Sequence, residues 1–297
     1  MKKILFTTLL FFLFLVGCSS DEQPQNQVEE GEDATEEPEQ PDDSVDIDTG
    51  NNQDNTVPEE DEIDAEIEEE EQEEQETLEP LYQLTENWNL EPISEEDNAN
   101  VVLLTIDDAP DEHALEMAKT LKELDAPAIF FVNGHFLDTD EEKEILKKIH
   151  DLGFEIGNHT YNHQNLSEVS EEQQKKEIVE LSDLIEEVIG ERPKYFRAPH
   201  GVNPDYSKQM VKDEGMLLMN WTYGYDYFKP YMDAEKLTTA MVTGEGPEVD
   251  VPYSLLKPGA NLLMHDREWT AKALEDIVNG LREKGFEMLD PKLIKTP

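Results

Sequence analysis

Cysteine and positive charge are both scarce in this 297-residue chain. It has one cysteine, Cys18, and its 23 Lys and Arg residues stand against 72 Asp and Glu, for a formal net charge of -49. A single cysteine permits no disulfide within the chain, so core packing must hold the fold. The shortage of basic residues excludes the positive surface that nucleic-acid binding needs. It equally excludes electrostatic attachment to anionic lipid.

The one long apolar run lies at the N-terminus. Lys2 and Lys3 precede the apolar run 4–16, broken only by Thr7 and Thr8, which Gly17 and Cys18 follow. This order is typical of an export signal, and the run is short for a membrane span. Residues 15–18 resemble the bacterial lipobox, in which the signal peptide, here 1–17, is removed and the cysteine is lipidated. We therefore expect an exported protein, anchored to the membrane by lipid on Cys18 and facing the extracellular side or cell wall. An uncleaved anchor or an ordinary signal peptide is the alternative.

The composition changes along the chain. Residues 21–100 contain 33 acidic residues and no Lys or Arg. Up to residue 77 apolar residues are too sparse to offset chain entropy, and the like charges keep the segment extended. We predict a disordered acidic linker over 18–77, a lead-in segment over 78–100 and one folded domain, monomeric, over 101–297.

Within 101–297, short apolar runs alternate with amphipathic segments. The predicted strands are 101–104, 128–132, 155–156, 195–196, 216–221 and 262–264, and the predicted helices are 114–124, 141–152, 170–189, 204–214, 234–242 and 270–284. Buried strands that alternate with helices indicate a parallel sheet with helical crossovers. At least six such units favour a closed or nearly closed (β/α) barrel.

Two adjacent carboxylates, Asp107 and Asp108, follow the first apolar strand. Active sites of barrels gather at the C-terminal ends of strands, and neighbouring acids can divide the work if one of them binds a metal. The alternative is an acidic turn that caps the helix expected to begin near Asp111.

His159 and His163 are spaced four residues apart after another short strand. On a helical turn this spacing places both imidazoles on one face, where they can bind one divalent ion. With Asp108 they would form a two-His-one-carboxylate set that leaves positions open for water and substrate. Taken alone, such a pair is more often structural.

Three further segments carry candidate residues. Arg197 follows the strand 195–196, and burial there would require a carboxylate partner, for which we predict Asp107; the alternative is a surface arginine with a neighbouring Glu. The stretch 220–228 is rich in aromatic residues, which stack on sugars or pack in a core, and it contains Asp226. His265 ends the strand 262–264, where a satisfied core histidine is the alternative.

Taken together and in order, the five segments resemble the motifs of the polysaccharide deacetylases, carbohydrate esterase family 4, which share the NodB homology domain. The family pattern reads roughly T-F-D-D-G-P, H-[ST]-x-x-H, R-x-P-[YFH]-G, an Asp-Trp element and L-x-H. Here these positions run from Thr105 to His265. The resemblance implies an α/β fold, a distorted (β/α) barrel with fewer than eight strands, and a catalytic domain over 101–297.

The resemblance also implies roles for individual residues. The metal triad would be Asp108, His159 and His163, with Asp107 as catalytic base and His265 as general acid, while Arg197 orients the base, Asp226 tunes the acid, and Pro199, His200, Tyr227 and Leu263 serve the substrate or the oxyanion. The metal would be zinc first, with cobalt, nickel or iron compatible. The substrate would be an N-acetylglucosamine polymer such as peptidoglycan or a chitin-like glycan, deacetylated with release of acetate.

Some positions depart from the family pattern. Ile106 and Ala109 replace Phe and Gly, His200 replaces the more frequent Tyr, Tyr227 replaces Trp, and Gly224 stands where an acid is common. No proposed metal or proton-transfer residue is missing. Two alternatives stay open, a glycan-binding lipoprotein with little or no turnover and an O-acetyl esterase acting on xylan-like glycans.

Overall fold

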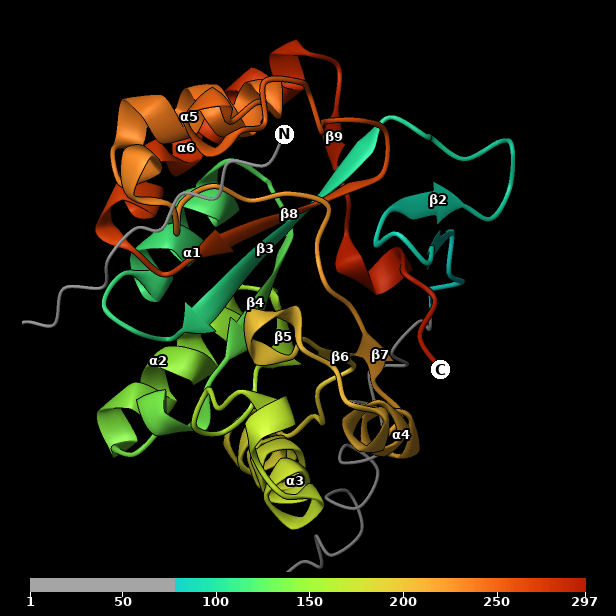
Figure 1. The fold of residues 1–297 in the computed structure, drawn as a ribbon, viewed down its shortest axis with the longest axis vertical. Helices are drawn as coiled ribbons and strands as arrows, with labels where there is room; N and C mark the ends of the chain where they lie inside the picture. The colour runs from blue at the N-terminus through green and yellow to red at the C-terminus, as the bar shows by residue number, and fades with distance from the viewer. Residues whose placement is uncertain (1–77) are drawn as a thin grey trace, which may run out of the picture. The chain divides into compact units, whose positions relative to one another are not determined.

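The computed structural model describes residues 78–297 (Figure 1). The predicted signal peptide 1–17, lipidation of Cys18 and linker 18–77 lie outside the described residues. Among the helices within 78–297, none is both long and apolar enough to cross a membrane.

One parallel sheet of seven strands organises the domain. Its order is β7-β6-β5-β4-β3-β8, and β9 also pairs with β3. The strands are β3 (Val101–Ala109), β4 (Ala128–Val132), β5 (Glu155–Asn158), β6 (Tyr195–Phe196), β7 (Leu217–Leu218), β8 (Ala260–His265) and β9 (Glu287–Met288). Beyond β7 the chain returns to β8 through a parallel bridge between Tyr223 and Leu262. The sheet thus curls into a distorted barrel with fewer than eight strands, which confirms the predicted fold class.

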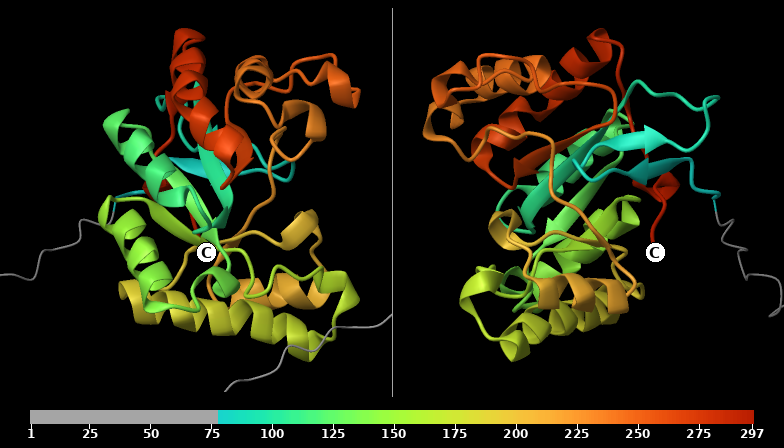
Figure 2. Two further views of the ribbon diagram at one scale, coloured as in Figure 1. Left: turned by 90° about the vertical axis from the view of Figure 1, so that its left-hand side faces the viewer. Right: turned by 45° about the vertical axis from the view of Figure 1, so that its right-hand side comes forward.

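Within the described residues 78–297, six α-helices lie around the sheet, as Figures 1 and 2 show. They are α1 (Ala114–Glu123), α2 (Asp140–Asp151), α3 (Glu171–Ile189), α4 (Asp205–Asp213), α5 (Ala234–Thr243) and α6 (Glu268–Glu283). All six lie within a few residues of their predicted positions. Local signals explain several boundaries: Thr139 and Glu142 form a capping box at the start of α2, and Gly190, in the left-handed conformation, ends α3.

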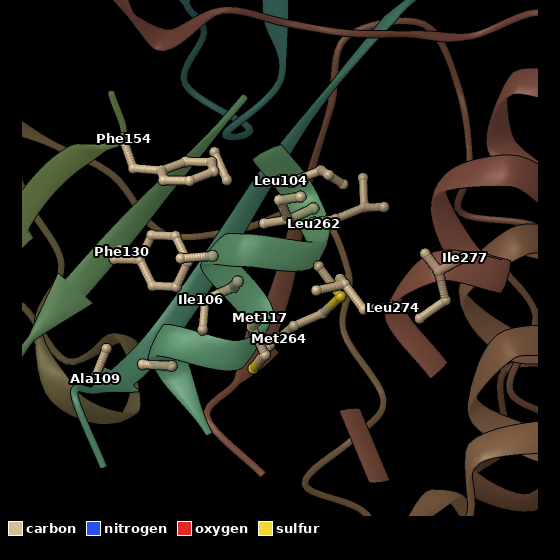
Figure 3. Packing of buried hydrophobic residues seen from close by; sticks show 14 of the residues in the cluster. Leu104, Ile106, Ala109, Met117, Phe130, Phe154, Leu262, Met264, Leu274 and Ile277 are labelled. Carbon is tan, nitrogen blue, oxygen red and sulfur yellow. The ribbon is translucent and has the colours of Figure 1, made fainter. Parts of the chain in front are cut away.

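Successive residues of a strand point to opposite faces of the sheet, so the strands contribute to two separate hydrophobic clusters, one outside the barrel and one inside it. Leu104 and Ile106 of β3 face outward and pack with Phe130 and with Met117 of α1 (Figure 3). The side chains between them face inward, where Leu103 belongs to a second cluster inside the barrel. Asp107 lies an even number of residues after Leu103 in β3, so its side chain points to the same, inner face of the sheet. The sequence of β3 therefore directs this carboxylate to the inside of the barrel.

A hairpin formed by the lead-in segment lies against the domain. Its strands β1 (Tyr82–Leu84) and β2 (Leu90–Pro92) were not predicted. Tyr82 forms a parallel bridge with Ile294, and the Leu90 N–H donates to the Gly259 carbonyl at 2.7 Å. Gly259 has a φ of +76°, and a Cβ there would lie 1.8 Å from the Leu90 carbonyl oxygen. Only glycine permits this close approach.

Candidate active site

The candidate residues meet at the C-terminal ends of the parallel strands. Asp107 and His265 are direct partners in the ladder between β3 and β8. His159 directly follows β5, and Arg197 directly follows the neighbouring β6. Residues separated by up to 158 positions are thus brought together by strand register, at the end of the barrel where the sequence places them.

A distortion at the end of β3 presents the second carboxylate. The register of β3 against β4 shifts between Ile106 and Ala109, and Asp108 has a left-handed φ of 59°. In a regular strand Asp108 would point away from the side that Asp107 occupies. The distortion instead places an Asp108 oxygen 3.8 Å from the Nε2 of His159, whose same nitrogen lies 3.6 Å from Asp107.

The alternative function of this acidic pair, capping a helix, is wrong. The N–H groups at the start of α1 are bound by Asp266 at the end of β8. Its carboxylate accepts hydrogen bonds from the backbone N–H groups of Asp111, His113 and Ala114, at 2.7, 2.7 and 2.9 Å. Asp107 and Asp108 therefore remain available for other contacts.

His159 and His163 lie on a loop, so the predicted helical turn is wrong. Thr160 and His163 have φ values of 70° and 52°, which interrupt any helix. The loop is held instead by Glu177 of α3, fully buried, whose carboxylate accepts from the Asn162 N–H at 2.6 Å. The two imidazoles still meet, with ring centroids 5.0 Å apart.

Asp108, His159 and His163 could hold a metal ion. Their candidate ligand atoms all lie within 4.8 Å of one another. Asp108 Oδ1 is 3.8 Å from His159 Nε2 and 3.5 Å from His163 Nε2. The Nδ1 of His159 contacts the Arg197 carbonyl at 2.7 Å, which fixes the ring and leaves Nε2 facing Asp108. Two imidazoles and one carboxylate are the donor set of a catalytic divalent ion, so these residues fit one.

The charge states of the three side chains suit metal binding. Burial lowers the pKa of His159, and burial together with His159 lowers that of His163 to about 4. Burial would raise the pKa of the Asp108 carboxyl, but the surrounding positive groups, His265 foremost, hold it below its ordinary value. At neutral pH both imidazoles are thus neutral and the carboxylate is ionised, as a metal requires.

Arg197 is fully buried and pairs with Asp107. Its Nη1 lies 2.6 Å from Asp107 Oδ1, the partner that the sequence predicts, and donates also to Thr105 Oγ1 at 2.7 Å. Burial lowers the pKa of Arg197, against the opposing effect of Asp107. The guanidinium also lies over the Phe131 ring, 4.3 Å from its centroid. These contacts fix one Asp107 oxygen and leave Oδ2 directed at His159.

His265 is held by Asp226. The Nδ1 of His265 is 2.8 Å from Asp226 Oδ1, and its backbone N–H donates to Asp226 Oδ2 at 2.6 Å. Thr270 donates to the same buried carboxylate at 2.8 Å. Burial disfavours the charged ring, but Asp226 outweighs it and raises the pKa of His265 to about 9. His265 is therefore protonated at neutral pH.

The four residues assigned to the substrate differ in exposure. Tyr227 is 42% exposed, with its ring 5.6 Å from that of His265. His200 is exposed, has a φ of 58°, and its ring lies 5.1 Å from that of His163. Pro199 and Leu263 are buried. Of the two sequence interpretations of the aromatic stretch, core packing is confirmed for Tyr223 and Tyr225, whereas Tyr227 lies exposed beside His265, where stacking on a sugar stays a prediction.

The glycine that replaces an acid in the fourth segment has a steric reason. A Cβ on Gly224 would lie 2.4 Å from the backbone oxygen of Leu263 in β8. No side chain fits this position without moving the strand that carries His265.

Sequence reasoning missed Glu177, Asp266 and Arg267. Arg267 Nη2 lies 2.6 Å from Asp108 Oδ2. Asp266 and Arg267 directly follow His265, and that adjacency was the available signal. Glu177 sits within a helix of many charged residues, where the sequence offers no sign that it is fully buried.

The fold and the site together define the class of protein: a (β/α) barrel whose strand ends carry three residues that could hold a metal ion, an arginine-bound carboxylate and an aspartate-bound histidine. The family profile for polysaccharide deacetylases matches residues 94–219, which include the candidate metal ligands, Asp107 and Arg197 but end before Asp226.

Three relatives support the assignment. Two peptidoglycan-N-acetylglucosamine deacetylases of Bacillus cereus are 27% and 30% identical over 202 and 194 residues, covering 67% and 63% of this chain and 70% and 67% of theirs. The solved structure of a mutant of a Bacillus anthracis carbohydrate esterase family 4 pseudoenzyme, with restored activity, has a TM-score of 0.55 and 28% identity, covering 64% of this chain and 65% of that one. The chain belongs to the polysaccharide deacetylase family.

Proposed function

We propose that this protein removes acetyl groups from N-acetylglucosamine units of a cell-envelope or extracellular polysaccharide by metal-dependent hydrolysis, releasing acetate. One observation carries the proposal. Asp107 and His265 are neighbours in the ladder between β3 and β8, and the Asp108, His159 and His163 triad lies beside them. A base, an acid and a metal triad at one strand end are the groups that amide hydrolysis needs.

Each side chain has a task in this reaction. Asp108, His159 and His163 would hold a divalent metal, which would supply Lewis-acid polarisation of the N-acetyl carbonyl. Asp107 accepts the proton of the attacking water through Oδ2, because Arg197 holds Oδ1. The water oxygen bonds to the carbonyl carbon, and the backbone N–H of His200 would donate to the resulting oxyanion.

The C–N bond then breaks, and its electrons go to the leaving nitrogen. His265 protonates that nitrogen, because Asp226 keeps Nδ1 engaged and the ring charged. The products are acetate and a free glucosamine amine. Tyr227, exposed beside His265, offers an aromatic face against which a sugar ring can lie.

Peptidoglycan is the preferred substrate in this proposal, since the two Bacillus cereus relatives are peptidoglycan-N-acetylglucosamine deacetylases. Zinc is the proposed metal, with cobalt, nickel or iron also suited to two imidazoles and one carboxylate. Lipidated Cys18 would hold the protein at the outer face of the membrane, and the acidic linker would let a monomer reach the wall.

A second function is a glycan-binding protein with little turnover. One solved structure to which this chain is similar is that of a mutant of a pseudoenzyme, and this similarity supports the second function. The intact set of Asp107, His265 and the metal triad supports the catalytic proposal instead.

The test is acetate release by the purified full chain, supplied with Zn²⁺ or Co²⁺, from chitooligosaccharides, peptidoglycan and acetylxylan. We expect acetate from at least one N-acetylated substrate. Binding of these glycans without acetate release would favour the second function. Release from acetylxylan alone would indicate an O-acetyl esterase.

A further inference from the structure

The last residue of β8 and the two residues that follow it each make a separate contact at or beside the site. His265 binds Asp226, Asp266 binds the backbone that leads into α1, and Arg267 contacts Asp108. We propose that Arg267 is a positioning residue that aims the Asp108 carboxylate at the two histidines and thereby increases the affinity of the site for a divalent metal. The inference rests on the proposed function, because it assumes that the triad binds a metal.

The two oxygens of Asp108 have separate partners. Oδ2 lies 2.6 Å from Arg267 Nη2, whereas Oδ1 faces the Nε2 atoms of His163 and His159, at 3.5 and 3.8 Å. The χ2 torsion of aspartate has a broad distribution, so a carboxylate without a hydrogen-bond partner rotates among many orientations. A hydrogen bond on Oδ2 restricts this rotation and leaves Oδ1 as the ligand atom. Outer partners of this kind orient metal ligands in proteins.

Arg267 is itself held in place. Its Nη1 donates to the Asp266 carbonyl at 2.7 Å and lies 3.5 Å from Asp111 Oδ2. The Asp266 side chain is buried and accepts three backbone N–H groups. Arg267 is 35% exposed and Asp108 14% exposed, so this pair is better fixed than an ordinary surface ion pair.

Two effects of Arg267 on metal affinity oppose each other. Its positive charge repels a cation, but that charge is partly exposed and therefore screened by solvent and salt. The restriction of the carboxylate acts directly on the ligand atom. Loss of such an outer partner typically weakens metal binding about 10–100-fold. We therefore expect removal of the Arg267 side chain to weaken metal binding.

The experiment compares zinc affinity of the full chain and three variants, by competition with a chromogenic chelator. Arg267→Ala is expected to raise the Kd for Zn²⁺ by about 10–100-fold. Arg267→Lys, which retains the charge but offers one point donor, should show a smaller increase. Arg282→Ala is the matched control, because Arg282 lies in α6, the helix that Arg267 precedes, and its guanidinium donates to the Asp125 carbonyl at the surface. Its Kd should equal that of the wild type.

The visible absorption of bound Co²⁺ gives a second readout, since it reports ligand geometry and should change in Arg267→Ala but not in Arg282→Ala. Unchanged or tighter zinc binding by Arg267→Ala would overturn the inference. If Arg267→Ala does not fold, the affinity of Arg267→Lys for zinc tests the inference. An affinity equal to that of the wild type would overturn it. A wild-type chain that binds no zinc would instead contradict the proposed function.

Discussion

The buried pair of Arg197 and Asp107 allows a quantitative prediction. Arg197 is 0% exposed and Asp107 2% exposed. The guanidinium also donates to Thr105 Oγ1 at 2.7 Å, to the Asn220 carbonyl at 3.0 Å and to Asn261 Oδ1 at 3.3 Å. Arg197→Met keeps much of the apolar volume but leaves a buried carboxylate without its countercharge. Removing one partner of such a pair lowers the free energy of unfolding by about 3–5 kcal/mol.

Arg192→Met is the control that separates burial from the number of ion pairs. Arg192 meets three carboxylates, Asp183, Glu186 and Glu214, at 2.8, 2.8 and 2.6 Å, more than Arg197 does. Its side chain is 36% exposed, so water and salt weaken these pairs. Exposed pairs contribute about 0.2–1 kcal/mol each. We therefore expect Arg192→Met to destabilise less than Arg197→Met.

Urea unfolding of the full chain measures both effects. A double variant, Arg197→Met with Asp107→Asn, should be more stable than the sum of the two single effects predicts, by about 1–3 kcal/mol, because the uncompensated charge is gone. It should remain inactive. The reasoning is refuted if Arg197→Met lowers the free energy of unfolding by less than about 1 kcal/mol, or if the two substitutions are additive.

Three further predictions concern the acid, the strand and the loop. Asp226 raises the pKa of His265 to about 9. Asp226→Asn should therefore lower that pKa and move the alkaline limb of the pH–rate profile towards about 6.5. An unchanged alkaline limb would contradict the role of His265 as general acid. Gly224→Ala would place a methyl 2.4 Å from the Leu263 carbonyl oxygen, whereas in the control Gly280→Ala the methyl meets only the movable Val242 side chain at 2.7 Å. Urea unfolding should therefore show a larger decrease in the free energy of unfolding for Gly224→Ala, about 1–3 kcal/mol. Equal decreases in the two variants would contradict the steric argument. Glu177→Gln puts an amide donor where the buried carboxylate accepts from Asn162 and Gln173, so it should lower the free energy of unfolding by about 1–3 kcal/mol and weaken zinc binding; unchanged values of both would show that this carboxylate does not hold the histidine loop.

The raised pKa of His265 also makes stability depend on pH. The protonated ring is favoured by folding, so its contribution is complete below the unfolded pKa of about 6.5 and disappears as the pH rises through about 9. His163 has the opposite sign. Its pKa falls to about 4 in the folded chain, so stability decreases as the pH drops from about 6.5 towards 4.

Sequence reasoning reached the barrel and the gathering of the site because both follow from local patterns. The buried strand β4 has a continuous apolar sequence and β3 begins with one, and the parallel arrangement places their ends together. The pairing of Arg197 with Asp107 followed from the high free energy of an unpaired buried charge. Each of these depends on one segment and a general rule.

Other features depend on tertiary contacts that a local pattern does not contain. The histidine spacing suggested a helical turn, whereas Glu177 and Asn133 hold the loop in a conformation with left-handed residues. The strands β1 and β2 have three residues each, and β9 has two, too short for any periodicity. The contact between Arg267 and Asp108 spans 159 residues and depends on the ladder between β3 and β8.

The most direct test of the central claim is acetate release from peptidoglycan, the preferred substrate of the proposal, by the zinc-loaded wild-type chain and by Asp107→Asn. Asp205→Asn serves as control, because Asp205 is fully exposed on α4. We predict that wild type and Asp205→Asn release acetate and free amine in equal amounts. Asp107→Asn should be slower by about 10²–10⁴-fold, the usual contribution of a general base. No acetate from the wild type, or equal rates in wild type and Asp107→Asn, would contradict the account.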